Sequence, residues 1–186
     1  MSQVELLAFL ADILRQLEVE WMLVGSHASS YFGEARSTHD IDVVVDLPEQ
    51  KVSKLMDIVP EDRYYLSEVA IREGRMANLI DTKTGDKVDM FFVGENVRSE
   101  QQLSRRVQAE ILGVSVFVAS IEDTIVSKLD WYQQTGGSER QVSDIRGIIR
   151  NQRTRIDLEQ LVRRVDHAGL RQTWDLQIAP WLEAEL

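Results

Sequence analysis

Hydrophobic residues recur at intervals of three and four positions over much of the chain, and shorter apolar runs alternate with these stripes. Val4, Leu7, Ala11 and Leu14 form the first stripe, which predicts an amphipathic helix over residues 2–18 with Ser2 as its N-cap. Further short helices are expected over residues 27–32, 48–58, 67–73 and 99–106. Apolar or alternating runs predict strands over residues 21–24, 40–45, 76–82, 87–93, 107–112 and 114–118.

The last third of the chain is helical in pattern throughout. Ser120 followed by Asp123 resembles a helix start. The predicted helices cover residues 120–134, the stripe of Val142, Ile145, Ile148 and Ile149, and residues 157–168 and 170–182. Strands first and helices last indicate an α+β fold, a mixed sheet flanked by helices with a C-terminal helical bundle. We expect a core over residues 1–119 and a helical region over residues 120–186 that packs on it.

Composition narrows the possible functions. The 186 residues are 44% hydrophobic and 28% charged, as in ordinary folded proteins. Cysteine is absent, which excludes thiolate catalysis, zinc fingers and disulfide scaffolds. The N-terminal residues lack the pattern of a signal peptide, and no apolar run approaches the ~20 residues of a membrane span. We therefore expect a cytoplasmic protein with no membrane partner.

Charge is distributed unevenly along the chain. The formal net charge is −10, and residues 1–95 contain 18 acidic and 9 basic residues, net −9. Such a balance disfavours broad binding to nucleic acid, which depends on Lys and Arg that neutralise phosphates. Between residues 140 and 164, however, arginines outnumber acidic residues. A polyanion is therefore expected at the C-terminal part, unless these arginines only form a solvated helix face.

Two aspartates at alternate positions are the strongest candidates for chemistry. Asp40 and Asp42 lie at the start of a predicted strand, where alternate side chains point to one face. Asp89, early in another predicted strand, can supply a third carboxylate. Hard oxygen ligands of this kind select Mg²⁺ or Mn²⁺. Asp-Ile-Asp alone is a weak signal, and the alternative is a set of solvated acids beside an unrelated turn.

A glycine and a serine end the preceding strand. Gly25 lets the backbone approach a phosphate closely, and Ser26 with the free amides of the next helix forms an anion site. Phosphoryl transfer needs both parts, because metal ions held by carboxylates bridge the triphosphate and stabilise the leaving pyrophosphate. The combination therefore favours nucleotide binding.

The order of these residues resembles the signature of the nucleotidyltransferase superfamily that includes DNA polymerase beta. Its matching positions are Val24, Gly25, Ser26, Asp40, Asp42 and Asp89. Within the superfamily the chain looks most like the AbiEii-type group, whose members are often toxins of toxin–antitoxin pairs. The likeness covers roughly residues 20–150 and includes 36–38, 78–81, 121–123, 128–132, Arg140, Gln141 and Asp144. It implies an NTP substrate, Mg²⁺ (or Mn²⁺), tRNA or another RNA as acceptor, and a cognate antitoxin as partner.

Further candidate site residues lie outside the aspartates and the glycine-serine bend. Lys128 lies on the apolar face of its predicted helix; it either reaches the triphosphate or extends to the surface. Asp144 either holds Lys128 in position or is a surface acid. Arg36 either contacts phosphate or fixes the loop before the strand, and Thr38 is assigned with it to nucleotide binding.

These interpretations lead to one main hypothesis and two alternatives. The main one is a Mg²⁺-dependent nucleotidyltransferase that moves a nucleoside monophosphate to an acceptor hydroxyl. Asp40 and Asp42 hold the metal ions, and Asp89 is a third ligand or the base for the acceptor. One alternative keeps the chemistry but transfers to a small molecule, such as an aminoglycoside, or to a protein side chain. The other is a non-catalytic module that binds an NTP or a partner.

Overall fold

The computed structural model describes residues 3–94 and 97–185, and contacts between residues divide the chain into two units. Unit 1 comprises residues 1–27 and 37–119, and unit 2 comprises residues 28–36 and 120–186. The predicted N-cap Ser2 lies outside the described residues. Residues 28–36 group with the C-terminal helices, whereas the sequence places them in the core; the division into domains at residue 119 stays a prediction.

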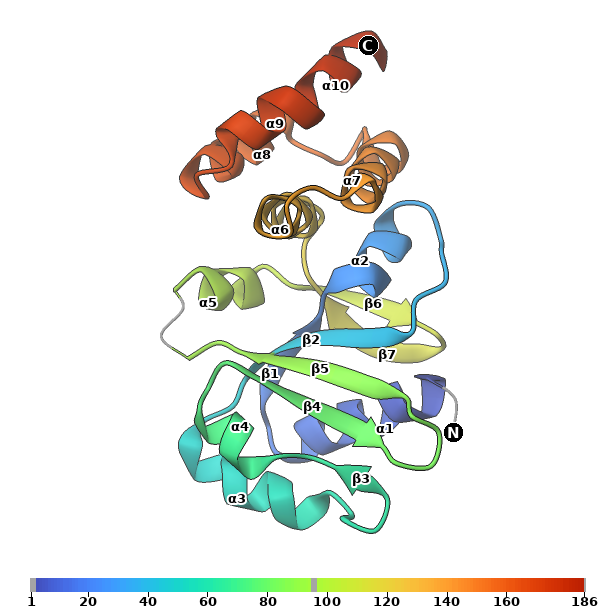
Figure 1. Cartoon of the computed structure of the whole chain (residues 1–186), viewed down its shortest axis with the longest axis vertical. Coiled ribbons are helices and arrows are strands. Elements are labelled where there is room, and N and C mark those ends of the chain that lie inside the picture. The colour runs from blue at the N-terminus through green and yellow to red at the C-terminus, as the bar shows by residue number, and fades with distance from the viewer. Residues whose placement is uncertain (1–2, 95–96, 186) are drawn as a thin grey trace. The chain divides into compact units, whose positions relative to one another are not determined.

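Unit 1 is built on a seven-stranded mixed sheet with the order β3-β4-β5-β2-β1-β7-β6 (Figure 1). Its strands are β1 (Glu20–Leu23), β2 (Asp40–Asp46), β3 (Tyr64–Tyr65), β4 (Met76–Asp81), β5 (Lys87–Phe92), β6 (Val107–Ile111) and β7 (Val114–Val118). The central strand β2 pairs antiparallel with β1 and parallel with β5. This pairing brings two strands that are far apart in sequence side by side.

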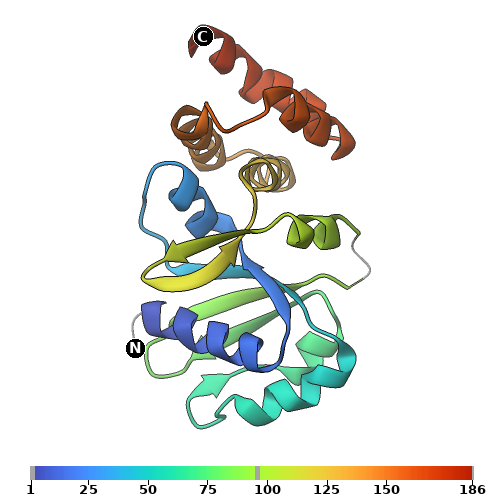
Figure 2. The ribbon, with the colours of Figure 1, turned by 180° about the vertical axis from the view of Figure 1, so that it is seen from behind.

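The two faces of the sheet differ in polarity because side chains alternate along β2. Ile41, Val43 and Val45 are fully buried, whereas Asp40 and Asp42 are only partly buried on the opposite face. Helix α1 (Gln3–Gln16) contacts strands β5 and β7 and lies across the apolar face of the sheet (Figure 2). Its buried residues are Leu6, Leu7, Leu10, Ile13 and Leu14.

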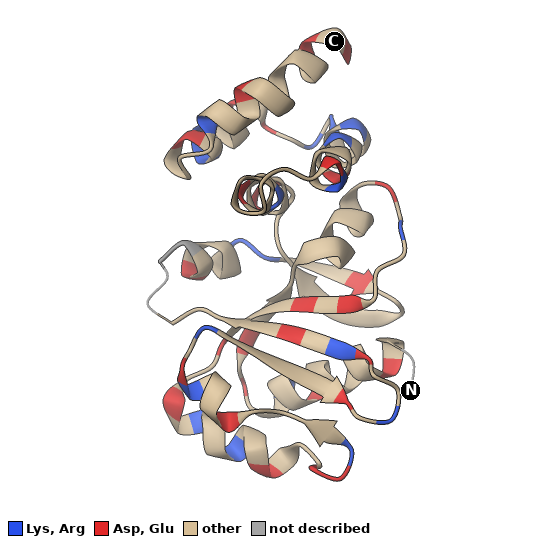
Figure 3. Cartoon of the chain, in the orientation of Figure 1, with Lys and Arg blue, Asp and Glu red and all other residues tan. Residues whose placement is uncertain are grey.

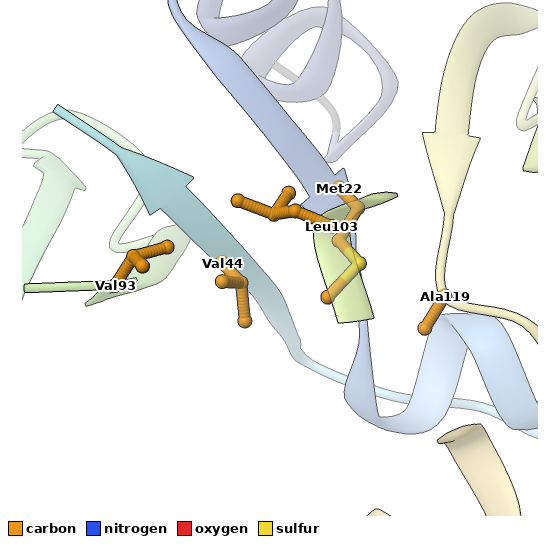
Figure 4. Close-up of a cluster of buried hydrophobic side chains, with 5 residues drawn as sticks. All are labelled: Met22, Val44, Val93, Leu103 and Ala119. Atoms are coloured by element: carbon orange, nitrogen blue, oxygen red, sulfur yellow. The ribbon is translucent and has the colours of Figure 1, made fainter. Parts of the chain in front are cut away.

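A second apolar cluster lies on the same face of the sheet as the aspartates. Strand alternation places Val44 there, and it packs with residues from β1, helix α5 (Val97–Ser104) and the ends of β5 and β7. The cluster consists of Met22, Val44, Val93, Leu103 and Ala119 (Figure 4). Packing in this cluster holds β1 and β2 together next to the segments of β2 and β5 that carry the aspartates.

Helices α3 (Glu49–Ile58) and α4 (Glu68–Arg72) complete unit 1 and contact each other. Both fall within the predicted ranges. The two-residue strand β3 was not predicted from the sequence. Tyr64 pairs with Asp81 of β4, and the neighbouring Arg63 forms an ion pair with the buried Asp81 carboxylate at 3.2 Å. A segment this short has no periodicity of its own, so only its pairing with β4 defines it as a strand.

Unit 2 is helical. Its helices are most of α2 (Gly25–Phe32), α6 (Ile121–Gln134), α7 (Glu139–Gln152), α8 (Leu158–His167), α9 (Arg171–Gln177) and α10 (Ala179–Glu185). The predicted cap of α6 is confirmed, because the Ser120 hydroxyl accepts a hydrogen bond from the Asp123 amide at 3.2 Å. Helix α7 is bound to residues 28–36, since Asn151 and Gln152 donate to the carbonyls of Gly33 and Phe32.

The predicted single helix over residues 170–182 is wrong in one respect, because the chain forms two helices there. Helix α9 ends at Gln177 and α10 begins at Ala179, with Ile178 between them. Pro180 is the second residue of α10. Proline has no amide hydrogen and clashes with the carbonyl four residues back, so it is tolerated in the first turn of a helix and interrupts a longer one.

The predicted fold class is confirmed as a mixed sheet flanked by helices and followed by a helical segment. Among the described residues, none of the helices combines the length and the apolar character that crossing a membrane would require.

Candidate active site

The predicted metal ligands occupy neighbouring positions on two strands. Asp42 of β2 is the direct register partner of Asp89 of β5, and Asp40 is the partner of Lys87. Neighbouring strands lie about 4.8 Å apart, and alternate residues share a face. The three aspartates therefore stand on one face of the sheet within two adjacent strands. Figure 3 shows acidic positions on β2 and β5 side by side, with one basic position on β5.

The carboxylates differ in exposure and in their partners. The Asp40 side chain is 46% exposed and the Asp89 side chain 12%. Asn78 of β4, the register partner of Asp89 on its other side, donates to Asp89 Oδ1 at 2.5 Å. Lys87 donates to Asp89 Oδ2 at 3.0 Å. Asp89 is thus held between two neighbours, a geometry that fixes the direction of its carboxylate.

Lys87 also approaches the second strand. Its Nζ lies 3.6 Å from Asp40 Oδ1, so one ammonium group contacts two of the three carboxylates. The hydrogen bond to Asp89 raises the pKa of Lys87 above its usual range, although partial burial acts in the opposite direction. The ammonium is therefore charged at neutral pH. Sequence reasoning missed Lys87, although its position two residues before Asp89 places both on one strand face.

Gly25 is required at its position by the Asp42 side chain. Its φ is +62°, and a Cβ atom built there would lie 2.1 Å from Asp42 Oδ2. The backbone amide of Val24 donates to the Asp42 carbonyl at 2.9 Å, which holds the two segments together. Only glycine allows both the left-handed conformation and this close approach. The bend predicted to grip phosphate is therefore in contact with a predicted metal ligand.

Replacing Gly25 by alanine tests this contact. We expect Gly25→Ala to lower the free energy of unfolding by about 2 kcal/mol, since a left-handed alanine costs about 1 kcal/mol and Asp42 must also move. Gly85→Ala is the matched control, because Gly85 has a φ of +79° and no atoms close to a built Cβ. The free energy of unfolding of Gly85→Ala should fall by about 1 kcal/mol. Urea unfolding measures both, and equal losses would contradict the close contact.

The remaining unit 1 residues of the predicted site lie at the ends of the same segments. Ser26 is the second residue of α2, beside Gly25. Thr38 precedes β2, and its hydroxyl donates to the Asp40 carbonyl at 3.4 Å, while its own carbonyl accepts from Gln3 at 3.0 Å. The first amides of α2 have no carbonyl partner within their helix, as at any helix start, and such amides bind anions. Thr38 fixes the entry into β2.

The other three predicted residues form a cluster of their own in unit 2. Lys128 of α6 donates to Asp144 Oδ2 at 2.6 Å, and Arg36 binds both carboxylate oxygens at 3.0 Å. Ser29, which the sequence did not indicate, adds a hydrogen bond at 3.3 Å. The Lys128 and Asp144 side chains are only 6% and 8% exposed. Lys128 therefore does not extend to the surface, and Asp144 is not a surface acid.

This cluster carries a net positive charge. Burial acts to raise the pKa of Asp144, but the hydrogen bonds from Arg36 and Lys128 outweigh it and lower the pKa below its usual range. One carboxylate thus binds two cations, so the formal charges of these three side chains add up to +1. Asp144 therefore fixes the positions of both cations.

The donor set in unit 1 fits a divalent cation in chemistry and in backbone placement. Three carboxylates of one strand pair share a face, and hard oxygen ligands are those that Mg²⁺ and Mn²⁺ prefer. In residues 3–94 and 97–185, however, no three His, Asp or Glu side chains converge as a metal site does. Lys87 contacts carboxylate oxygens of Asp40 and Asp89, and Asn78 donates a hydrogen bond to Asp89.

Comparison with known proteins identifies the fold. Neither a family model nor a curated protein sequence matches the chain. A nucleotidyltransferase-like protein from Paracoccidioides brasiliensis has a similar structure, with a TM-score of 0.65 at 18% identity over 97% of this chain and 90% of that one.

Two antibiotic-modifying proteins are also similar in structure. ANT(2")-Ia, solved with adenylyl-2"-tobramycin, gives a TM-score of 0.59 at 17% identity over 94% of this chain and 99% of that one. The lincosamide antibiotic adenylyltransferase LnuA, solved with lincomycin, gives a TM-score of 0.54 at 15% identity over 80% of this chain and 96% of that one. The chain therefore has the nucleotidyltransferase fold that its sequence pattern predicts.

Proposed function

We propose that this chain is a divalent-metal-dependent nucleotidyltransferase that moves a nucleoside monophosphate from an NTP to an acceptor hydroxyl. The observation that supports this most is the placement of Asp42. It pairs in register with Asp89 on β5 and at the same time touches the backbone of Gly25. Metal ligands and a phosphate-binding bend are thus adjacent, as phosphoryl transfer requires.

The residues have separate roles in this proposal. Asp40 and Asp42 hold Mg²⁺ or Mn²⁺, and Asp89 is either a third ligand or the base. A bound divalent ion would neutralise charge on the triphosphate and lower the pKa of the attacking hydroxyl. The backbone at Gly25 and Ser26 binds phosphate oxygens, and we assign Thr38 to fixing the strand entry beside them. Lys128 and Arg36, held by Asp144, supply positive charge for the nucleotide.

The reaction itself is a substitution at phosphorus. The acceptor oxygen forms a bond to the α-phosphorus of the NTP, the bond from that phosphorus to the bridging oxygen breaks, and pyrophosphate leaves. The proton of the acceptor hydroxyl passes to Asp89 where Asp89 acts as the base. Asp89 is oriented for this by Asn78, whose amide group holds one oxygen of the carboxylate.

The acceptor we propose is RNA, with tRNA as the first candidate, in a toxin-like role with a cognate antitoxin. This part rests on the AbiEii-type resemblance and on the arginines between residues 140 and 164. A small cationic acceptor is the second candidate, because residues 1–95 carry a net charge of −9. ANT(2")-Ia, which has the same fold, was solved with an adenylylated aminoglycoside.

Label transfer tests the proposal. The protein is incubated with Mg²⁺, each NTP labelled at the α-phosphate, and total RNA, cell protein or aminoglycosides in separate reactions. We expect label on RNA with one preferred NTP, released pyrophosphate in equal amount, and no label when a chelator removes the metal ion. Label on an aminoglycoside instead would select the second acceptor. NTP binding without label on any acceptor would favour a non-catalytic binding module and would contradict the proposed reaction.

A further inference from the structure

Lys87 occupies the space between two of the predicted metal ligands. Its Nζ lies 3.0 Å from Asp89 Oδ2 and 3.6 Å from Asp40 Oδ1. Both contacts follow from the strand register, since Lys87 is the partner of Asp40 and stands two residues before Asp89 on one face. The ammonium group therefore forms ion pairs with carboxylates of both strands, all within unit 1.

These contacts distinguish Lys87 from the other lysine near the same turn. Lys83 lies in the β4–β5 turn and its side chain is exposed. Lys87 is 37% exposed, between strands whose positions the sheet fixes. The side chain is thus held by its two carboxylates, yet open enough to solvent to swing away from them.

We propose that Lys87 is a resident cation of the metal site, which contacts Asp40 and Asp89 and which a divalent ion must displace in order to bind. The inference rests on the proposed function, because it takes the three aspartates as metal ligands. An ammonium group and a divalent ion that share the same carboxylates lie close together and repel each other strongly where water is partly excluded. Lys87 therefore weakens metal binding and sets the concentration at which the site fills. It is a positioning residue, not a metal ligand.

Direct measurement of metal affinity tests this role without relying on turnover. Free Mn²⁺ is followed by electron paramagnetic resonance as it is titrated into the wild-type protein and its variants. We expect Lys87→Met to bind Mn²⁺ about tenfold more tightly than the wild type, because it removes the competing charge and keeps the length of the side chain. Lys87→Arg keeps the charge and should stay within about threefold of the wild type.

Lys83→Met is the matched control, since it removes the same formal charge from the same hairpin. It should change Mn²⁺ affinity less than about twofold at 0.15 M salt, where charges beyond about 8 Å are screened. Unchanged or weaker Mn²⁺ binding by Lys87→Met would overturn the inference, because a merely structural lysine can only weaken the site when it is lost. Circular dichroism checks the fold, and Lys87→Gln replaces Lys87→Met if the latter does not fold.

The outcomes separate this inference from the proposed function. If the wild type binds Mn²⁺ in a manner that Asp42→Asn abolishes, while Lys87→Met binds no better than the wild type, the metal site stands and the role of Lys87 is wrong. If neither the wild type nor Lys87→Met binds Mn²⁺ through Asp42, the metal assignment fails, and the role of Lys87 fails with it.

Discussion

Asp42→Asn is expected to reduce nucleotidyl transfer by about 10³-fold or more while the protein keeps its fold. The amide has the shape of the carboxylate but lacks its charge, so it binds a divalent cation poorly. Asp42 is central among the three aspartates, because it shares a face with Asp40, pairs with Asp89 and touches the backbone at Gly25. Its loss is expected to affect both the proposed metal site and the bend proposed to bind phosphate.

The measurement is label transfer under saturating NTP, with circular dichroism to confirm the fold. Asp46→Asn is the matched control, since Asp46 is the exposed last residue of the same strand β2. It removes the same charge and should leave transfer within about twofold of the wild type, as expected for a solvated group. Transfer at the wild-type rate in Asp42→Asn would show that Asp42 is not a metal ligand.

Asp144→Asn is expected to lower the free energy of unfolding of the protein by about 4 kcal/mol. The carboxylate is the shared partner of Lys128 and Arg36, and Lys128 is buried. Removing one partner of a buried ion pair leaves an uncompensated charge, which typically costs about 3 to 5 kcal/mol. Asparagine keeps one acceptor oxygen but cannot balance two cations.

Denaturant unfolding, followed through the fluorescence of the unit 2 tryptophans, measures this loss. Trp131, Trp174 and Trp181 all belong to unit 2. Asp175→Asn is the control, because Asp175 pairs with Arg171 on the surface with both side chains about half exposed. It should cost less than about 1 kcal/mol. An Asp144→Asn variant as stable as this control would contradict a buried, charge-balancing role for Asp144.

The lowered pKa of Asp144 also predicts how the effect of Asp144→Asn on stability depends on pH. Because the pKa of Asp144 is lowered in the folded protein, its contribution to stability is complete above the unfolded pKa of about 3.9. That contribution is lost as the pH falls through the lower, folded pKa. The difference in stability between the wild type and Asp144→Asn should therefore be constant from pH 8 to about pH 5 and shrink below about pH 4. A difference that grows on acidification would reverse the assignment.

Local sequence patterns were sufficient to predict much of the fold. The alternation of β2 identifies its buried face, because side-chain direction repeats every two residues in a strand. The same alternation predicts that Asp40 and Asp42 share a face. The stripe predicted for α1 was wrong in part: Leu7 and Leu14 are buried, but Val4 is 38% exposed. The buried face of α1 is completed instead by Leu6, Leu10 and Ile13. Strand β3 has only two residues, so its sequence contains no period that could predict it. The break between α9 and α10 was missed as well, although Pro180 is a signal for it.

What the sequence by itself determined is which residue types stand on which face: the aspartates on one side of β2, Gly25 at the strand end, and Lys128 on the apolar side of its helix. Only the tertiary structure decided the partners: Asp42 with Asp89, Lys87 with Asp40, and Asp144 with Lys128 and Arg36. The reason is that side-chain direction depends on neighbouring backbone angles. Strand register and helix contacts depend on residues tens of positions away, which no local period records.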